Sequence, residues 1–265
     1  MVSRALRALQ LRAADLADVA RGRRDPLTPP RRYLDFVGDS DFQATGEEFL
    51  EHFRTLAGLQ ATDRVLDVGC GIGRMARVLT RELRPPGSYD GFDISLEAVE
   101  WCRRHYVRMG VPFTFTHADL ANSLYNPGGR VAPSEYQFPY LDRSFDLVIA
   151  TSVFTHLLAD AADHYLAQAA RVLAPRGRLF ATWLLVGGDS PASSHGAAFD
   201  FSAVAGDGVA LVADPAVPEA AVAYPETWLR SRLAEYRLRV REPIRYGTWR
   251  GREGLSFQDI VVVER

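Results

Sequence analysis

The chain has 265 residues, of which 47% are hydrophobic and 24% are charged, and its formal net charge is -2 at pH 7. This composition is typical of a folded globular protein, and with only 2 cysteines it excludes a disulfide-rich scaffold. All 31 basic residues are arginines, which excludes a lysine nucleophile, a Schiff base and a phosphate-binding loop that depends on lysine.

The first part of the chain carries helical patterns. Residues 4–22 have the spacing of an amphipathic helix, and the proline-rich stretch 26–30 ends it. A second helical pattern covers residues 47–56. We assign residues 1–58 to an N-terminal helical cap. Its first helix is expected to pack on its own domain or on a second copy of the chain, so a homodimer is possible.

From residue 59 onward, strand and helix signals alternate. The segments with strand character are 64–68, 89–94, 112–116, 145–151 and 177–185, and the helical segments between them are 74–83, 96–109 and 161–173. Such alternation predicts an α/β fold with a doubly wound, mostly parallel sheet that helices cover on both faces.

Two segments interrupt the alternation and are interpreted as insertions, at about 121–140 and 187–224. The second is rich in Gly, Ala, Ser, Pro and Asp and lacks periodicity, which indicates an irregular lid. A helix near 226–236 and strands near 237–241 and 257–264 would complete the sheet. The domain is therefore predicted to extend over residues 59–265.

A glycine-rich turn follows the first strand of this domain. Gly69, Gly71 and Gly73 lie between a strand and a helix, where glycine lets the backbone turn sharply and lets a ligand approach closely. A dinucleotide fingerprint requires glycine at position 74, where this chain has Arg74. Asp67 would repel a pyrophosphate and attract the sulfonium and ammonium groups of S-adenosylmethionine.

Two more carboxylates follow the next two strands. Asp93 stands 20 residues beyond Gly73, where a carboxylate can accept the hydroxyls of a ribose. Asp119 could accept an adenine amino group while the backbone of Leu120 pairs with the ring. Each carboxylate alone could equally cap a turn or a helix. Three of them at the ends of successive strands fit a cationic nucleoside.

These motifs resemble the class I S-adenosylmethionine-dependent methyltransferases. The resemblance covers about residues 59–185 and rests on the segments VLDVGCGIGR, GFDIS, HADL, FDLVIATSVFTHL and RVLAPRGRLFATW. It implies S-adenosylmethionine as cofactor and a seven-stranded sheet with a reversed last strand, to which SFQDIVVVE would correspond. The cofactor-binding residues that we expect are Asp67, Gly69, Gly71, Gly73, Arg74, Asp93, Ile94, Asp119, Leu120 and Thr151.

The acceptor end of the site is less well marked. His156 follows the fourth strand, where the resemblance places the transferred methyl group, and we take it as the candidate general base. A packed histidine that only bonds the local backbone is the alternative. Asp142, Tyr140, Tyr33 and His195 are further titratable candidates without a motif. Trp183 and Trp249 are the candidates for stacking on an acceptor, and packing against the core is the alternative for each.

The expected function is methyl transfer to a small organic acceptor, with a hydroxyl of a sugar or secondary metabolite as the preferred target. An NAD-dependent oxidoreductase and a noncatalytic nucleoside-binding partner protein are the alternatives. No metal-ligand spacing is present in the sequence. A pI near 6.3 gives no reason to expect nucleic acid, and no apolar run is long enough for a membrane span or a secretory signal, so a cytoplasmic location is expected.

Overall fold

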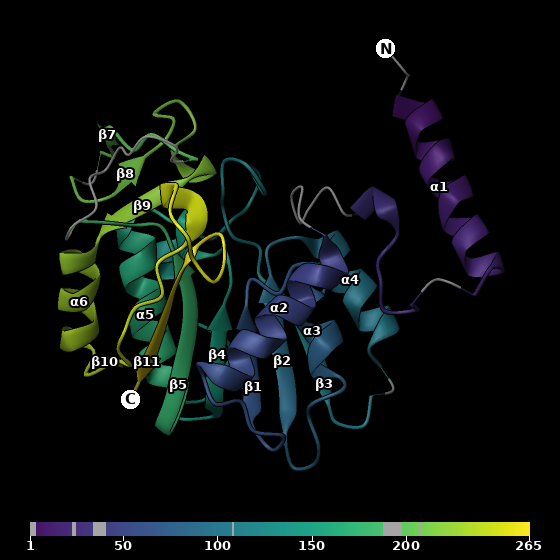
Figure 1. Cartoon of the computed structure of the whole chain (residues 1–265), viewed down its shortest axis with the longest axis horizontal. Coiled ribbons are helices and arrows are strands. Elements are labelled where there is room, and N and C mark those ends of the chain that lie inside the picture. The colour runs from purple at the N-terminus through teal and green to yellow at the C-terminus, as the bar shows by residue number, and fades with distance from the viewer. Residues whose placement is uncertain (1–3, 23–24, 34–40, 108, 188–197, 207) are drawn as a thin grey trace.

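The computed structural model describes the chain except for residues 1–3, 23–24, 34–40, 108, 188–197 and 207 (Figure 1). The α-helices are α1 (Arg4–Ala20), α2 (Phe42–Thr55), α3 (Arg74–Leu79), α4 (Leu96–His105), α5 (Ala159–Val172) and α6 (Glu226–Glu235). The strands of the main sheet are β1 (Arg64–Val68), β2 (Ser88–Asp93), β3 (Phe113–His117), β4 (Phe145–Ala150), β5 (Leu173–Trp183), β10 (Arg239–Val240) and β11 (Asp259–Glu264).

The main sheet has seven strands in the order β10-β11-β5-β4-β1-β2-β3. Strands β1 to β5 pair in parallel, whereas β11 runs antiparallel to both β5 and β10. This confirms the doubly wound fold with a reversed last strand. Because the order reverses direction between β1 and β4, the carboxyl ends of these strands border a crevice, where ligands of open α/β sheets bind.

Alternating residues of the central strands pack into two separate hydrophobic cores, one on each face of the sheet. Val65 and Leu147 pack with helices α2, α3 and α4 on one face of the sheet. Leu66 and Val148, the next residue in each strand, pack with α5 and α6 on the other face. Strands buried on both faces read as continuous apolar runs, which is why β1 and β4 are recognisable in the sequence.

The lid region is not irregular throughout, so that expectation is wrong for its described second half. Strands β6 (Leu185–Val186), β7 (Ala203–Val204), β8 (Leu211–Val212) and β9 (Val222–Pro225) form a second sheet in the order β6-β9-β8-β7. Strands of two to four residues are too short to show the period-two pattern by which a strand is recognised. The remaining part of the expected lid, at 188–197 and 207, lies outside the described residues.

Several helix ends differ from the expected ones. Helix α2 begins five residues earlier than expected, because Asp41 caps it and accepts a hydrogen bond from the backbone N–H of Ala44 at 2.6 Å. Helix α3 ends at Leu79, four residues before the expected end. Helix termini are set by a few local hydrogen bonds, so apolar periodicity locates them poorly.

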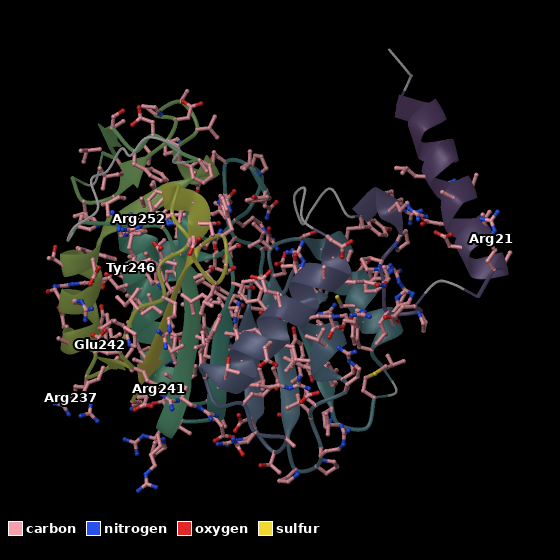
Figure 2. All side chains as sticks on the ribbon, in the orientation of Figure 1. Arg21, Arg237, Arg241, Glu242, Tyr246 and Arg252 are labelled. Atoms are coloured by element: carbon pink, nitrogen blue, oxygen red, sulfur yellow. The ribbon has the colours of Figure 1, made fainter. Side chains whose placement is uncertain are left out.

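The two helices of the expected N-terminal cap have different environments. Helix α1 stands apart from the sheet, and Arg21 beyond its end lies far from the core (Figures 1 and 2). Arg31 bonds Asp15 and Asp18 of α1, at 3.2 and 2.6 Å. Helix α2 packs directly on the sheet. Within the described residues, no helix combines the length and apolar character that a membrane span requires.

Candidate active site

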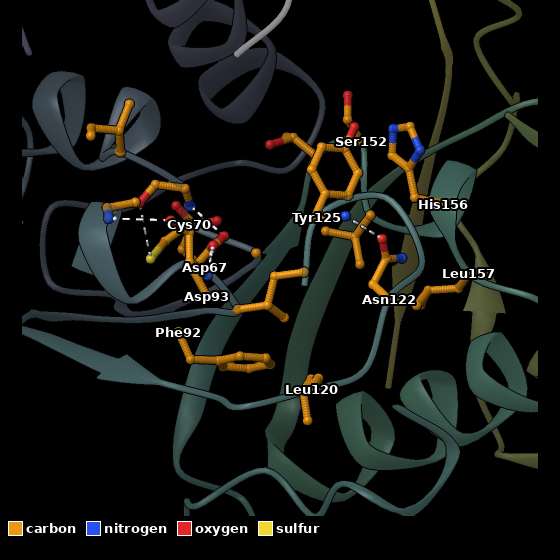
Figure 3. A pocket seen from close by; sticks show the side chains of 18 of the residues that line it. Asp67, Cys70, Phe92, Asp93, Leu120, Asn122, Tyr125, Ser152, His156 and Leu157 are labelled. Carbon is orange, nitrogen blue, oxygen red and sulfur yellow. Dashed lines mark hydrogen bonds between the residues drawn. The ribbon is translucent and has the colours of Figure 1, made fainter. Parts of the chain in front are cut away.

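A cavity of about 350 Å³ opens at the carboxyl ends of the parallel strands (Figure 3). Its lining comes from the turn after β1, the end of β2 and the segments that follow β3 and β4. In Figure 3 the carboxylates Asp67 and Asp93 lie on one side of this cavity, and Tyr125 and His156 lie on the other. The cavity thus has an acidic end and a histidine end.

The glycine turn is folded back onto the end of β2. The backbone N–H groups of Gly69 and Cys70 donate to the Phe92 carbonyl at 2.9 and 3.0 Å, and the N–H of Gly71 donates to Oδ2 of Asp93 at 2.8 Å. Gly71 has a φ of 51°, in the left-handed region that favours glycine. A Cβ atom there would meet no other atom within 4 Å, so this part of the turn presents open space to a ligand.

Asp67 is a buried carboxylate, and one of its two oxygens has no hydrogen-bond partner among the described residues. Its Oδ2 accepts the hydroxyl of Tyr89 at 2.6 Å, whereas Oδ1 is buried and accepts no hydrogen bond from the described residues. Burial raises the pKa of Asp67 to about 7, and the nearby Asp93 carboxylate adds to the rise. An unpaired buried acceptor of this kind is costly unless a ligand satisfies it.

Asp93 lies beside the same turn. Its two oxygens accept backbone N–H groups of Gly71 and Ser95, each at 2.8 Å. Burial raises the pKa of this carboxyl too, while those backbone donors oppose the rise. Each carboxylate oxygen has a second lone pair, so Asp93 can still accept the hydroxyls of a ribose.

The polar groups at the acidic end of the cavity therefore fit S-adenosylmethionine. The unpaired Oδ1 of Asp67 is the acceptor that an ammonium group requires, and a positive charge would relieve the mutual repulsion of Asp67 and Asp93. Arg74 also lines the cavity, and burial lowers the pKa of its guanidinium. A carboxylate on the ligand would suit that arginine.

The structure brings most of the sequence-predicted residues to the cavity wall. Those that line it are Asp67, Gly69, Gly71, Arg74, Asp93, Ile94, Leu120, Thr151 and His156. Gly73 lies just behind, at the N-cap of α3.

Asp119 is not in the lining. Its carboxylate is engaged by Nε of Arg130 at 2.5 Å and by Nδ2 of Asn126 at 3.3 Å. The backbone N–H of Leu120 donates to the Ala118 carbonyl at 2.8 Å, so it is already used. An adenine contact by the Asp119 carboxylate would require these interactions to change.

His156 lies at the opposite end, in the short 3-10 helix η3 (Phe154–His156). Its Nδ1 lies 2.9 Å from the backbone carbonyl of Glu219, and the ring of Tyr125 meets it edge-on with 5.4 Å between centroids. Burial lowers the pKa of His156, which keeps the ring neutral at physiological pH. A neutral histidine at a cavity wall can accept a proton.

The lining also contains Tyr125, which lies in the predicted insertion, and Ser152, which sequence reasoning did not single out. Tyr125 is presented by a turn in which Oδ1 of Asn122 accepts the backbone N–H groups of Leu124 and Tyr125, at 3.0 and 2.9 Å. Ser152 has a φ of 58°, unusual for a residue other than glycine, and its N–H donates to Oγ1 of Thr182 at 2.7 Å. Such strained backbone gathers at functional sites.

The structure agrees with the packing alternative for the two tryptophans and not with acceptor stacking. Trp183 is 1% exposed and stacks on Phe154 at 4.0 Å, and Trp249 donates its Nε1–H to Asp259 at 3.0 Å. Both rings belong to the packed interior and neither lines the cavity. Asp142, Tyr140 and Tyr33 also lie outside the lining, and His195 lies outside the described residues. Among the residues that the structure describes, no three His, Cys, Asp or Glu side chains are grouped as metal ligands.

An open, mostly parallel sheet with a glycine turn and buried carboxylates at the carboxyl ends of its strands defines a Rossmann-like, nucleoside-binding class of protein. Residues 65–177 match the family model described as a methyltransferase domain. This region, which is less than half of the chain, is similar to the class I S-adenosylmethionine-dependent methyltransferases.

Curated relatives match part of the chain. A fatty-acid O-methyltransferase of Mycolicibacterium smegmatis is 32% identical over 114 residues, which are 43% of this chain and 34% of that protein. Phthiotriol/phenolphthiotriol dimycocerosates methyltransferase 1 of Mycobacterium ulcerans is 33% identical over 122 residues, 45% of this chain and 36% of that protein. The matched region thus spans only about a third of the length of these relatives.

Solved structures share the fold. The PH0226 protein of Pyrococcus horikoshii aligns with a TM-score of 0.55 at 13% identity, over 88% of this chain and 96% of that one. A Burkholderia thailandensis N1-methyltransferase with bound 1,6-didemethyltoxoflavin and S-adenosylhomocysteine aligns at 0.53 and 16% identity, over 100% and 91%. The [4+2]-cyclase SpnF aligns at 0.51 and 16% identity, over 86% and 85%. Since a cyclase shares it, the fold alone does not fix the reaction.

Proposed function

We propose that this protein transfers the methyl group of S-adenosylmethionine to a hydroxyl of a small organic acceptor of the secondary-metabolite type. The observation that carries the proposal is the pairing, across one cavity, of an unsatisfied Asp67 carboxylate with a neutral His156. The first suits a cationic nucleoside and the second suits an acceptor that arrives with a proton. Two relatives named above as methyltransferases, one of them an O-methyltransferase, support the same reaction class.

The acceptor end favours an apolar skeleton over a sugar. Tyr125 and Leu157 contribute aromatic and aliphatic surface to the lining near His156. A sugar would need several polar partners to replace its hydration, whereas an apolar ring or chain needs only surface.

The roles of the chain's own groups follow from their positions. S-adenosylmethionine supplies an activated methyl group for an in-line displacement. Asp67 and Asp93 hold the nucleoside, and the cavity walls align the acceptor oxygen, since such a transfer depends mainly on orientation. His156 accepts the hydroxyl proton at Nε2, because Nδ1 faces a carbonyl oxygen and must carry its own hydrogen.

The proposal is tested with His156→Ala. We expect adenosylhomocysteine to bind the variant almost as tightly as it binds the wild type, by calorimetry, while methyl transfer to a hydroxylated acceptor slows by about 10²–10⁴-fold. Radiolabelled methyl transfer to a panel of hydroxylated aromatic and aliphatic compounds measures the rate. His105→Ala is the matched control, because His105 is an exposed histidine of α4 that does not line the cavity.

Three outcomes would contradict the proposal. Wild-type rates in His156→Ala would reduce that histidine to a structural role. Binding of NADH in place of adenosylhomocysteine would favour the oxidoreductase alternative, and tight nucleoside binding without turnover of any acceptor would favour a noncatalytic partner protein.

A further inference from the structure

Glu219 connects three separate parts of the chain at the histidine end of the cavity. It lies in the short 3-10 helix η4 (Pro218–Ala220) of the lid. Oε2 of its carboxylate accepts the backbone N–H of Ser123, at 2.6 Å, and the hydroxyl of the same serine. Its backbone carbonyl faces Nδ1 of His156 at 2.9 Å. One residue thus holds the insertion at 121–140 with its side chain and the candidate base with its main chain.

The other end of this link leads back into the cavity. Ser123 belongs to the turn closed by Asn122, whose backbone exchanges two hydrogen bonds with that of Asn126, at 3.2 and 3.1 Å. The same turn carries Tyr125, which packs edge-on against His156 (Figure 3). The insertion and the lid therefore meet around His156 from two sides, and the Ser123 contact with Glu219 joins them at the exposed rim.

The carbonyl of Glu219 determines which nitrogen of His156 can act as a base. A carbonyl oxygen only accepts hydrogen bonds, so Nδ1 must carry the proton, and the lone pair of the neutral ring is then on Nε2. Without that carbonyl the neutral ring could place its proton on either nitrogen. In the form that is protonated at Nε2, the nitrogen that we assign to proton abstraction has no lone pair.

We propose that Glu219 is a positioning residue, whose carboxylate fastens η4 to Ser123 and thereby keeps the Glu219 carbonyl on His156. This inference rests on the proposed function, because it acts through His156 as the base. Glu219 itself touches neither the nucleoside end nor the reacting atoms. Its effect is to hold His156 in the tautomer with a free Nε2 while the insertion and lid are joined.

Glu219→Ala tests the assignment, because it removes both contacts with Ser123 and keeps the backbone carbonyl. The full chain is labelled with ¹⁵N-histidine, and the ¹⁵N chemical shifts of the two ring nitrogens are measured. We expect wild-type His156 to give the shifts of the Nδ1–H tautomer. In the variant we expect shifts averaged between the Nδ1–H and Nε2–H tautomers. The His156 signals are identified by their loss in His156→Ala. We expect kcat to fall by about tenfold, part of the full contribution of a general base, with KM for S-adenosylmethionine unchanged.

Two further variants distinguish a positioning role of Glu219 from a general loss of structure. Glu219→Gln keeps an oxygen that can accept from Ser123 and should restore most of kcat and the wild-type tautomer. Glu135→Ala is the matched control, since Glu135 is an exposed glutamate in η2 (Pro133–Glu135), a 3-10 helix of the same insertion, and it should change neither readout.

The inference is overturned if His156 of Glu219→Ala keeps the Nδ1–H tautomer, or if the tautomer changes and kcat does not. It is also overturned if wild-type His156 carries its proton on Nε2. The tautomer is read without turnover, so these failures differ from failure of the proposed function, in which the wild type transfers no methyl group to hydroxylated acceptors. If Glu219→Ala misfolds by circular dichroism, Ser123→Ala, which removes one of the two hydrogen bonds, should shift both readouts in the same direction by less.

Discussion

Asp67 has an ionisation state that cofactor binding should change. Burial raises its pKa to about 7, so in the free protein roughly half of the molecules carry a protonated Asp67 at that pH. An ammonium group beside Oδ1 favours the ionised form, and binding below pH 7 must then release a proton. We expect the affinity for adenosylhomocysteine to fall by about tenfold per pH unit below pH 7 and to be constant above it.

Calorimetry across this pH range, in two buffers of different ionisation enthalpy, measures both the affinity and the proton release. Asp67→Asn provides the comparison, because it keeps the size of the side chain and cannot ionise. Its binding should be weaker and nearly independent of pH in the same window. Asp93, whose pKa burial also raises, is present in both proteins. Parallel pH profiles for the two proteins would show that Asp67 does not face the ligand's ammonium.

At the scale of an element, the turn between β1 and α3 offers a contrast between two glycines. Both have positive φ, 71° at Gly69 and 51° at Gly71. A Cβ at Gly69 would lie 2.6 Å from Cγ2 of Val153, whereas a Cβ at Gly71 would enter open space. Gly69→Ala combines backbone strain with overpacking and should lower the free energy of unfolding by about 2–4 kcal/mol.

Gly71→Ala should cost only the backbone strain, about 1–2 kcal/mol, because no atom opposes the added methyl group. That methyl group would instead occupy ligand space, so this variant should lose more cofactor affinity than stability. Urea denaturation measures the free energy of unfolding of each variant, and calorimetry measures the affinity of each for adenosylhomocysteine. Equal losses of stability in the two variants would show that Val153 moves aside and that the turn does not depend on this close approach.

The elements that the sequence predicts well are those with strong local signals. The apolar runs of β1 and β4 and the three glycines between β1 and α3 are visible without any tertiary information. Long-range contacts are not visible in this way. Arg130 of the insertion occupies the carboxylate of Asp119, and Glu219, 63 residues from His156, supplies the partner of its ring. A motif gives the position of a residue along a strand, but competition between distant side chains decides what that residue faces.

In the whole molecule, the two N-terminal helices differ in how they are attached to the rest of the fold. Phe53 of α2 is fully buried and meets Phe180 of β5 edge-on, with 4.9 Å between the ring centroids. Among the contacts of the described side chains, helix α1 is joined to the rest by the ion pairs that Arg31 makes with Asp15 and Asp18, and the Arg31 side chain is 40% exposed. Partly exposed ion pairs contribute little to stability. The predicted division at residue 58 therefore separates α2 from a core that it helps to fill.

We expect Phe53→Ala to lower the free energy of unfolding by about 3–5 kcal/mol, because it leaves a cavity between α2 and the sheet. Deletion of residues 1–22, which removes α1 and keeps α2, should change it by about 1 kcal/mol or less, since it mainly releases the exposed pairs of Arg31. Chemical denaturation followed by tryptophan fluorescence measures both. A loss on deletion as large as that of Phe53→Ala would mean that α1 belongs to the cooperative core. A small effect of Phe53→Ala would instead support a cap that folds separately up to residue 58.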